Sequence, residues 1–399
     1  MQTRGLGRRG SRASIVVATA VAVAAGVGLL PGQTAAATEH DTPRVDATTR
    51  AGFQRLATAV LTDRTQALVG DTRTGARAQH RQTTPAQKTV TLSPAAALHE
   101  RAVLDGLRDR RARLAALGET YSKGATSVTV DAADVNGRRA TVRVTETTTL
   151  TYAKARRAEP TATGFRAHHE LTFQADRRGD WLLTAVRDTD GGQPTVNQVT
   201  GPAAAPRTAA VPRVAADAPP NAPRAATTWP AAASPKNLTT GAYDYKAMAA
   251  YAQKYWRNYN PAYPSFDGAG AGGDCTNFVS QSLKAGGWKH VPGYVYDWHK
   301  WFGNADIQSH SFVGVNEFSW FALSSQRVTS LANVYQMDIG DVLQIDFDKD
   351  GSKDHTMVVT SRSAQGVPYL TYHSVNTYSR SVTSILASHP TAAYYAYRT

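Results

Sequence analysis

Residues 272–281 read Gly-Gly-Asp-Cys-Thr-Asn-Phe-Val-Ser-Gln, and they predict a glycine loop that leads directly into a helix. Asp274 suits the N-cap of that helix, because its carboxylate can accept a backbone N–H of the first turn. An apolar stripe runs from Cys275 to Leu283, and Gly286-Gly287 ends the helix. Cys275 is therefore expected in the first helical turn.

Cys275 is the single cysteine among the 399 residues. Unpaired N–H groups and the helix dipole favour negative charge at a helix start, so we expect a lowered thiol pKa and a nucleophilic thiolate. The alternative is a small apolar residue of the core, where free cysteines are common. The position at the helix start favours the nucleophile.

His355 and His373 are the histidines best placed to serve such a nucleophile. His355 opens one predicted strand and His373 lies in the next, with a hairpin at residues 364–366 between them. Side chains on paired antiparallel strands can lie about 5 Å apart. We therefore expect His355 to act as general base and His373 to orient it. Asn376 is the alternative third residue, and a surface position at a strand edge is the alternative for His355.

The segment around these residues, 241–399, has an α+β pattern in which helices precede an antiparallel sheet. Helices are expected over residues 243–258 and 274–285. Strands are expected at residues 341–347, 355–361, 368–374, 381–386 and 392–397.

Residues 241–399 closely resemble the bacterial putative amidase domain, a branch of the papain-like superfamily that includes NlpC/P60 and CHAP peptidases. The resemblance rests on residues 274–281, on Gly-Asp-Val-Leu-Gln at 340–344 and on Asp-Gly…Asp-His-Thr at 350–356. It implies a papain-like domain, in which a helix carrying the cysteine packs on an antiparallel sheet. It also implies a triad of Cys275, His355 and, as the third residue, His373. From the residues themselves, Asp274 and Asn376 are our secondary candidates.

The carboxylates of Asp346, Asp348, Asp350 and Asp354 have the spacing of a calcium loop, with Gly351 at its sixth position. Position twelve is Met357, so the usual bidentate glutamate is missing. An Asp-Gly pair between two strands is also an ordinary hairpin turn. We favour the turn, and we expect neither a metal nor a cofactor.

The first 37 residues are typical of a secretory signal peptide. A head with four arginines precedes the apolar residues 13–30, and Ala35-Ala36-Ala37 supplies a cleavage site. An uncleaved membrane anchor is the alternative. We expect a secreted protein with no stable membrane insertion after cleavage.

Residues 45–190 predict a smaller α+β domain, in which two helices precede alternating strands. The order loosely resembles cystatin-like or NTF2-like modules. The adjacent His168 and His169 are expected on the solvated surface, because neighbouring strand residues face opposite ways. Residues 191–240 hold nine prolines and are expected to form an extended Pro/Ala/Thr-rich linker.

The net charge of +13 lies entirely before residue 240, because residues 240–399 hold 12 basic and 12 acidic residues. Attraction to anionic wall polymers is one reading of this basic half, and general solubility is the other. No motif indicates nucleic-acid binding. We expect a secreted cysteine amidase or peptidase that acts through a thioester, with peptidoglycan as substrate. An acyl transferase and a non-catalytic wall-binding protein are the alternatives.

Overall fold

The computed structural model describes residues 45–70, 91–156, 159–191, 194–199, 218–267 and 273–399. The expected signal peptide, residues 1–37, lies outside them. Within the described residues, no helix has both the length and the apolar character needed to cross a membrane.

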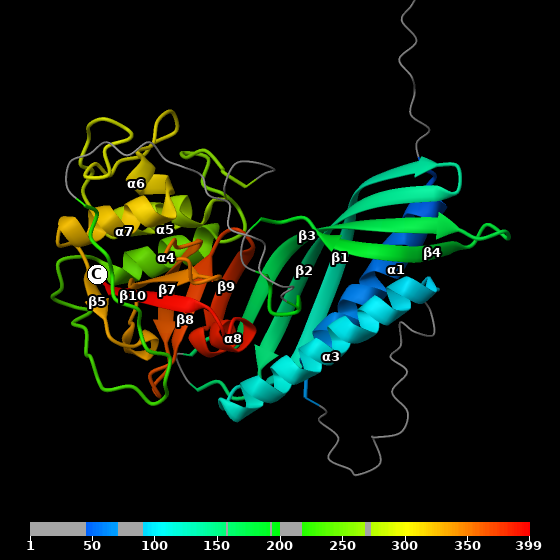
Figure 1. Ribbon diagram of the computed structural model, residues 1–399, viewed down its shortest axis with the longest axis horizontal. Coiled ribbons are helices and arrows are strands. Elements are labelled where there is room, and N and C mark those ends of the chain that lie inside the picture. Colours follow the sequence, from blue (N-terminus) through cyan, green and yellow to red (C-terminus); the bar gives the residue numbers. More distant parts are fainter. Residues whose placement is uncertain (1–44, 71–90, 157–158, 192–193, 200–217, 268–272) are drawn as a thin grey trace, which may run out of the picture. The chain divides into compact units, whose positions relative to one another are not determined.

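Two helices and a four-stranded meander form the first half of the described chain (Figure 1). Asp46 and Ser93 cap the two helices by accepting a backbone N–H three residues on. Gly137 turns the first hairpin with a φ of +58°. The elements are α1 (Ala47–Gln66), α3 (Pro94–Ala116), β1 (Tyr121–Asn136), β2 (Arg139–Tyr152), β3 (Ala162–Ala175) and β4 (Trp181–Asp188). The expected order of helices before strands in residues 45–190 is thus observed.

The second half is also mixed α and β. Its helices are α4 (Tyr245–Tyr255), α5 (Cys275–Ala285), α6 (His310–Val313), α7 (Val315–Ser324) and α8 (Val382–Ser388), with the short 3-10 helix η2 (Val334–Gln336). Its strands are β5 (Thr329–Leu331), β6 (Val342–Asp346), β7 (His355–Arg362), β8 (Pro368–Tyr372), β9 (Asn376–Ser381) and β10 (Ala393–Arg398).

The strand expected at residues 381–386 is wrong, because the chain forms helix α8 there. The hydroxyl of Ser381 accepts the N–H of Ser384 and caps this helix. Val382 and Ile385 are β-branched, which made the segment resemble a strand, yet both lie on the buried side of the helix. The strand before it, β9, covers residues that we had read as a connection.

One antiparallel sheet of ten strands runs through both halves in the order β1-β2-β3-β9-β8-β7-β6-β10-β5, and β4 also pairs with β3. The link between the halves is β3 with β9, where Gly164 faces Tyr378 and Arg166 faces Asn376 (Figure 1). We expected two domains at 45–190 and 241–399. The structure places both in one compact unit with a shared sheet.

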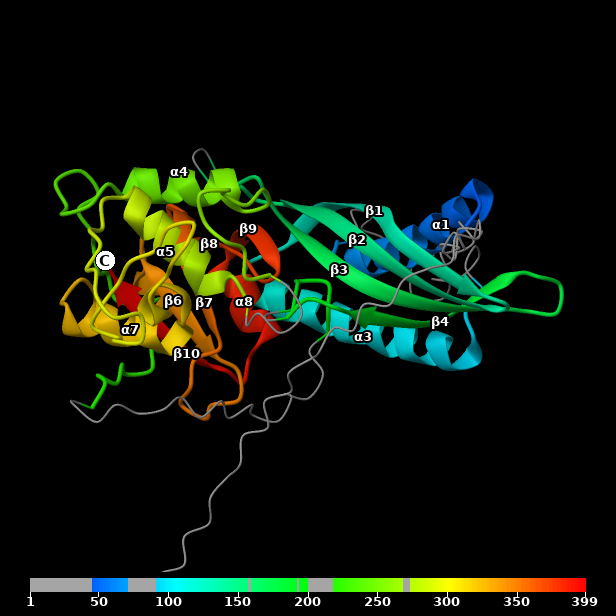
Figure 2. The same ribbon diagram turned by 90° about the horizontal axis from the view of Figure 1, so that it is seen from above.

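The two faces of the sheet in the second half bury different side chains, because successive strand residues point to opposite sides. Val342 and Val358 face the core beneath α4 and α5. Leu343 and Met357, their chain neighbours, face a second core that includes residues of α8. Figure 2 shows the same elements from above. The face on which a residue of β7 lies therefore decides whether it can meet α5.

The described parts of residues 191–240 do not form the extended linker that we expected. Residues 195–198 are buried, and Arg110 of α3 donates to the carbonyls of Val196 and Gln198 at 2.6 and 2.7 Å. Farther along, Lys236 forms a buried ion pair with Asp341 at 2.6 Å. Backbone carbonyls and one lysine thus supply packing contacts that proline content does not reveal.

Candidate functional site

Cys275 is the first residue of α5, as the sequence predicted. Asp274 occupies the N-cap position, but its side chain accepts no backbone N–H of the helix. Its Oδ1 accepts instead from the N–H of Phe266 at 2.9 Å and from the amide of Asn277 at 2.8 Å. Its Oδ2 lies 2.6 Å from Nδ1 of His373. The capping role that we expected is replaced by contacts that join the loop before α5, the helix itself and the turn after β8.

The chain on each side of Asp274 is held against Ser374. The N–H of Asp274 donates to the Ser374 hydroxyl at 2.6 Å, and that hydroxyl donates to Asp267 at 2.9 Å. Gly273 has a φ of +94°, and a Cβ there would lie 3.0 Å from the Ser374 hydroxyl. Glycine is therefore required at position 273 both for its backbone angle and for this close approach.

The thiol of Cys275 is buried, with 4% of the residue exposed. Its nearest side-chain partner is the Thr276 hydroxyl at 3.8 Å, and the backbone N–H of Thr356 also faces it. Burial raises the pKa of the Cys275 thiol, and these donors lower it by less. The lowered thiol pKa that we expected is therefore not observed, because loss of solvation outweighs the donors near the helix start.

His373 lies beside the first turn of α5. Its ring stacks on Phe278, with centroids 3.9 Å apart, and lies tilted against Tyr259 at 4.1 Å. Nδ1 meets the Asp274 carboxylate, and Nε2 lies 2.9 Å from the carbonyl oxygen of Tyr255. A carbonyl can only accept, so Nε2 carries a hydrogen in this arrangement. His373 is thus oriented by Asp274 and does not bond the thiol.

His355 begins β7, as predicted, but its ring points away from Cys275. It lies edge-on to Tyr372 at 5.1 Å, on the face that α8 helps to cover. The next residue, Thr356, points to the other face and bonds the Thr276 hydroxyl of α5 at 2.9 Å. Within the described residues, neither ring nitrogen of His355 has a hydrogen-bond partner. Burial lowers the pKa of His355 to about 3.

Strand register explains why His355 and His373 are not neighbours. Val358 of β7 pairs with Thr371 of β8. Alternation then puts Thr356 on the face of Thr371, toward α5, and His355 on the opposite face. His373 lies in the turn after β8 and packs on Phe278 of α5. We expected the two imidazoles to meet as base and orienting residue, and this register does not bring them together.

Asn376, the alternative third residue, lies at the start of β9. Its side-chain oxygen accepts the hydroxyl of Tyr259 at 2.8 Å. Tyr259 in turn lies tilted against His373. Asn376 therefore holds the ring of Tyr259, which covers His373, and its hydrogen bond is to Tyr259 rather than to the imidazole.

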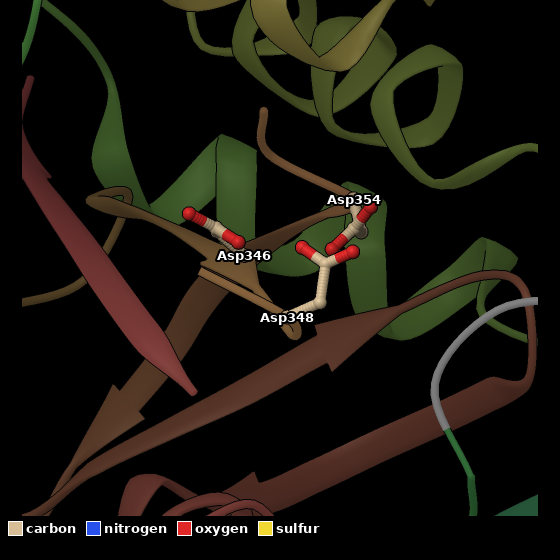
Figure 3. A group of neighbouring side chains, drawn as sticks. All are labelled: Asp346, Asp348 and Asp354. Carbon is tan, nitrogen blue, oxygen red and sulfur yellow. The ribbon is translucent and has the colours of Figure 1, made fainter. Parts of the chain in front are cut away.

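The acidic loop between β6 and β7 brings three of its four carboxylates together. Ligand oxygens of Asp346, Asp348 and Asp354 lie within 4.8 Å of one another (Figure 3). Asp346 also accepts the backbone N–H groups of Lys349 and Gly351, the contacts of a tight turn. Burial, followed by the neighbouring carboxylates, raises the pKa of Asp354. The three carboxylates have oxygen atoms suited to binding a hard cation. The hydrogen bonds that Asp346 accepts from the turn also fit the hairpin that we favoured.

The first half contains an imidazole that the sequence did not single out correctly. His169 is 1% exposed, and its Nδ1 and Nε2 lie 2.8 and 2.9 Å from Asp188 and Glu146. These carboxylates outweigh burial and raise the pKa of His169 to about 9. Our prediction of a solvated surface is wrong for His169. Strand alternation puts only His168 on the exposed side, and the sequence carried no signal of the two partners.

Comparison with known proteins shows that residues 242–397 match the family described as "Putative amidase domain". The chain is 30% identical over 129 residues to the uncharacterized protein YhbB of Bacillus subtilis (strain 168), covering 32% of this chain and 40% of that protein. It is 32% identical over 142 residues to the uncharacterized protein YjcM of the same organism, covering 33% and 31%. The chain thus spans less than half the length of either relative. The family match indicates an amidase-type domain in the second half.

Two solved structures also align with this chain. They are the intermembrane space region of the chloroplast protein ARC6, at 19% identity, and the Kfla4162 protein of Kribbella flavida, at 15%. They cover 37% and 36% of this chain, and 98% and 95% of their own. Both have a TM-score of 0.23, which is too low to establish a common fold.

Proposed function

We propose that residues 242–397 hydrolyse an amide bond through a thioester on Cys275. The observation that carries this proposal is the position of Cys275 at the first residue of α5, next to the Asp274–His373 pair. A thiol nucleophile needs a nearby imidazole, and the imidazole needs a group that orients it. The family match to an amidase domain supports the reaction type.

His373 is the imidazole that the geometry favours as general base. Asp274 already orients its Nδ1, and the ring lies beside the turn that bears the thiol. For proton transfer, Nε2 would leave the Tyr255 carbonyl, release its hydrogen to solvent and turn its free lone pair toward Cys275, since catalytic hydrogen bonds often form only when substrate binds. His355, the base that the resemblance implies, would have to move its ring from the α8 face to the α5 face.

The reaction follows from these roles. The imidazole removes the thiol proton, and the thiolate attacks the carbonyl carbon of the amide. The N–H of Cys275 at the start of α5 would stabilise the oxyanion. The imidazolium then gives its proton to the leaving amine, which leaves a thioester. Water, deprotonated by the imidazole, attacks the thioester, releases a carboxylic acid and restores the thiol.

The substrate that we propose is an amide of bacterial peptidoglycan. The support is the signal-like residues 1–37 and the excess of basic residues before residue 240, which would favour anionic cell-wall polymers. Two alternatives remain. If an amine intercepts the thioester, the enzyme is an acyl transferase. If the protein is not catalytic, it binds the cell wall through the basic residues before residue 240.

The test compares single variants on purified peptidoglycan fragments, with released amines measured. Cys275→Ala should lower the rate at least about 10³-fold while leaving the folded state intact. His373→Gln should lower it much more than His355→Gln, and His299→Gln, which changes an exposed imidazole, is the matched control. Undiminished release by Cys275→Ala would refute the thioester. A greater loss in folded His355→Gln would return the role of base to His355.

A further inference from the structure

Two arginines are buried where the halves of the chain meet, and neither is neutralised. Arg110 of α3 is 2% exposed and Arg380 of β9 is 1% exposed. Arg110 donates to backbone carbonyls, and Arg380 to the hydroxyls of Tyr372 and Ser388. Among the residues that the structure describes, neither guanidinium forms an ion pair with a carboxylate. Buried charges without a counter-charge are unfavourable.

The two guanidinium groups hold the same short segment. Arg380 donates to the carbonyl of Pro194 at 3.2 Å, and Arg110 to that of Val196 at 2.6 Å. The two positive charges repel each other. Burial, followed by this repulsion from Arg380, lowers the pKa of Arg110 to about 9. Helix α8 lies beside α3 where the two halves of the chain meet (Figures 1 and 2). A contact from Arg113 to the carbonyl of Ala387 confirms that closeness.

Two buried polar atoms at this junction also lack partners within the described chain. They are Nε of Arg110 and Nε2 of His389. These residues are at most 6% exposed. Burial, then Arg380 and Arg110, lowers the pKa of His389 to about 3, which shows that the imidazole shares their positive surroundings. Buried donors in proteins are normally paired, so this cluster suggests a missing acceptor.

Glu119 is the described carboxylate whose pKa responds to Arg380, and it has other partners. Glu119 accepts the hydroxyl of Tyr121 at 2.7 Å and is also bonded by Ser381. Burial raises the pKa of Glu119, and Arg380 lowers it only as a lesser effect. Glu119 therefore leaves the charge on Arg110 without a counter-charge.

We propose that the junction of α3, residues 194–198 and α8 binds a small oxyanion of the phosphate, sulfate or carboxylate class. Guanidinium groups bind such oxyanions through charge-assisted hydrogen bonds, which suits Nε of Arg110. Nε2 of His389 supplies a further donor at the end of α8. The bound anion would join the first half of the chain to the second. The proposal is independent of the amidase reaction.

The test is thermal and chemical unfolding of the purified protein in sodium phosphate, against sodium chloride of equal ionic strength. Sulfate and acetate arms distinguish a tetrahedral anion from a carboxylate. Well above the dissociation constant, each tenfold increase in the free anion concentration should raise the folding equilibrium constant about tenfold. Arg110→Met should abolish this dependence, whereas Arg101→Met, on the exposed side of α3, should retain it.

Equilibrium dialysis with labelled phosphate gives a second measurement on the unmodified protein. His389→Phe removes one donor at the end of α8 and should weaken binding about tenfold or more, which keeps the proposal testable if Arg110→Met fails to fold. The proposal is overturned if no oxyanion stabilises the unmodified protein beyond chloride. Equal anion dependence in folded Arg110→Met and Arg101→Met would also overturn it.

Discussion

The part of the chain that the structure describes contains two buried imidazole–carboxylate groups, and they differ in what surrounds them. In the second half, His373 contacts a backbone carbonyl and the carboxylate of Asp274. Asp274 is the residue directly before Cys275. In the first half, His169 meets two carboxylates, Glu146 and Asp188. The described structure places no thiol near His169, since the only cysteine is in α5. A buried imidazole–carboxylate contact alone therefore does not distinguish the two groups, and the neighbouring thiol does.

The second partner of each ring is the informative difference. A carbonyl oxygen is neutral, so His373 can give up that contact without leaving a buried charge unpaired. Glu146 is fully buried and also accepts from Thr148 and Asn197, so loss of His169 would strand a carboxylate. We therefore expect the contact of His373 with Asp274 to control activity, and the contacts of His169 with Glu146 and Asp188 to control stability.

Asp274→Asn should give the largest effect and is the most direct way to break the comparison. The amide keeps the shape of the side chain but removes the charge that orients His373, and we expect the hydrolysis rate to fall about 10³-fold, or about 4 kcal/mol. The midpoint of thermal unfolding should change little in comparison. Steady-state rates and unfolding curves on the same preparation check both parts. A folded Asp274→Asn with full activity would remove His373 from the mechanism.

Glu146→Gln is the matched change in the first half. It leaves His169 with one carboxylate instead of two, and we expect the free energy of unfolding to fall by about 3 kcal/mol. The hydrolysis rate per folded molecule should stay the same. Urea unfolding measures the first quantity and active-site titration of Cys275 normalises the second. If Glu146→Gln were as stable as the parent protein, the contacts of His169 would not control stability, and the expected difference from the contacts of His373 would be lost.

The local parts of the structure were predictable from sequence, and the contacts between distant strands were not. The helix that carries Cys275 follows from the glycine loop and the apolar stripe, which are signals within about 15 residues. The face on which His355 lies depends on the pairing of β7 with β8, and a shift of one residue reverses it. No single-sequence pattern specifies that register.

The same limit applies to His169 and to the shared sheet. His169 lies opposite Asp188 on β4 and diagonally from Glu146 on β2, so its partners depend on two strand registers. The pairing of β3 with β9 joins residues more than 200 positions apart, beyond any local pattern. The error at α8 is different, because β-branched residues favour strands only weakly and the Ser381 cap decided the local structure.

The pH dependence of stability gives the smallest expected effect and separates the two imidazoles without mutating the proposed catalytic residues. The pKa of His169 is raised to about 9, so its stabilising contribution is complete below the ordinary histidine pKa and is lost as the pH rises through about 9. Between pH 7 and 9.5 we expect the free energy of unfolding to fall by about 2 kcal/mol from this group. Urea unfolding across that range measures it, and His169→Gln should flatten the decline. An equal decline in both proteins would mean that another group causes it, and that the charge on His169 does not distinguish the first half from the second.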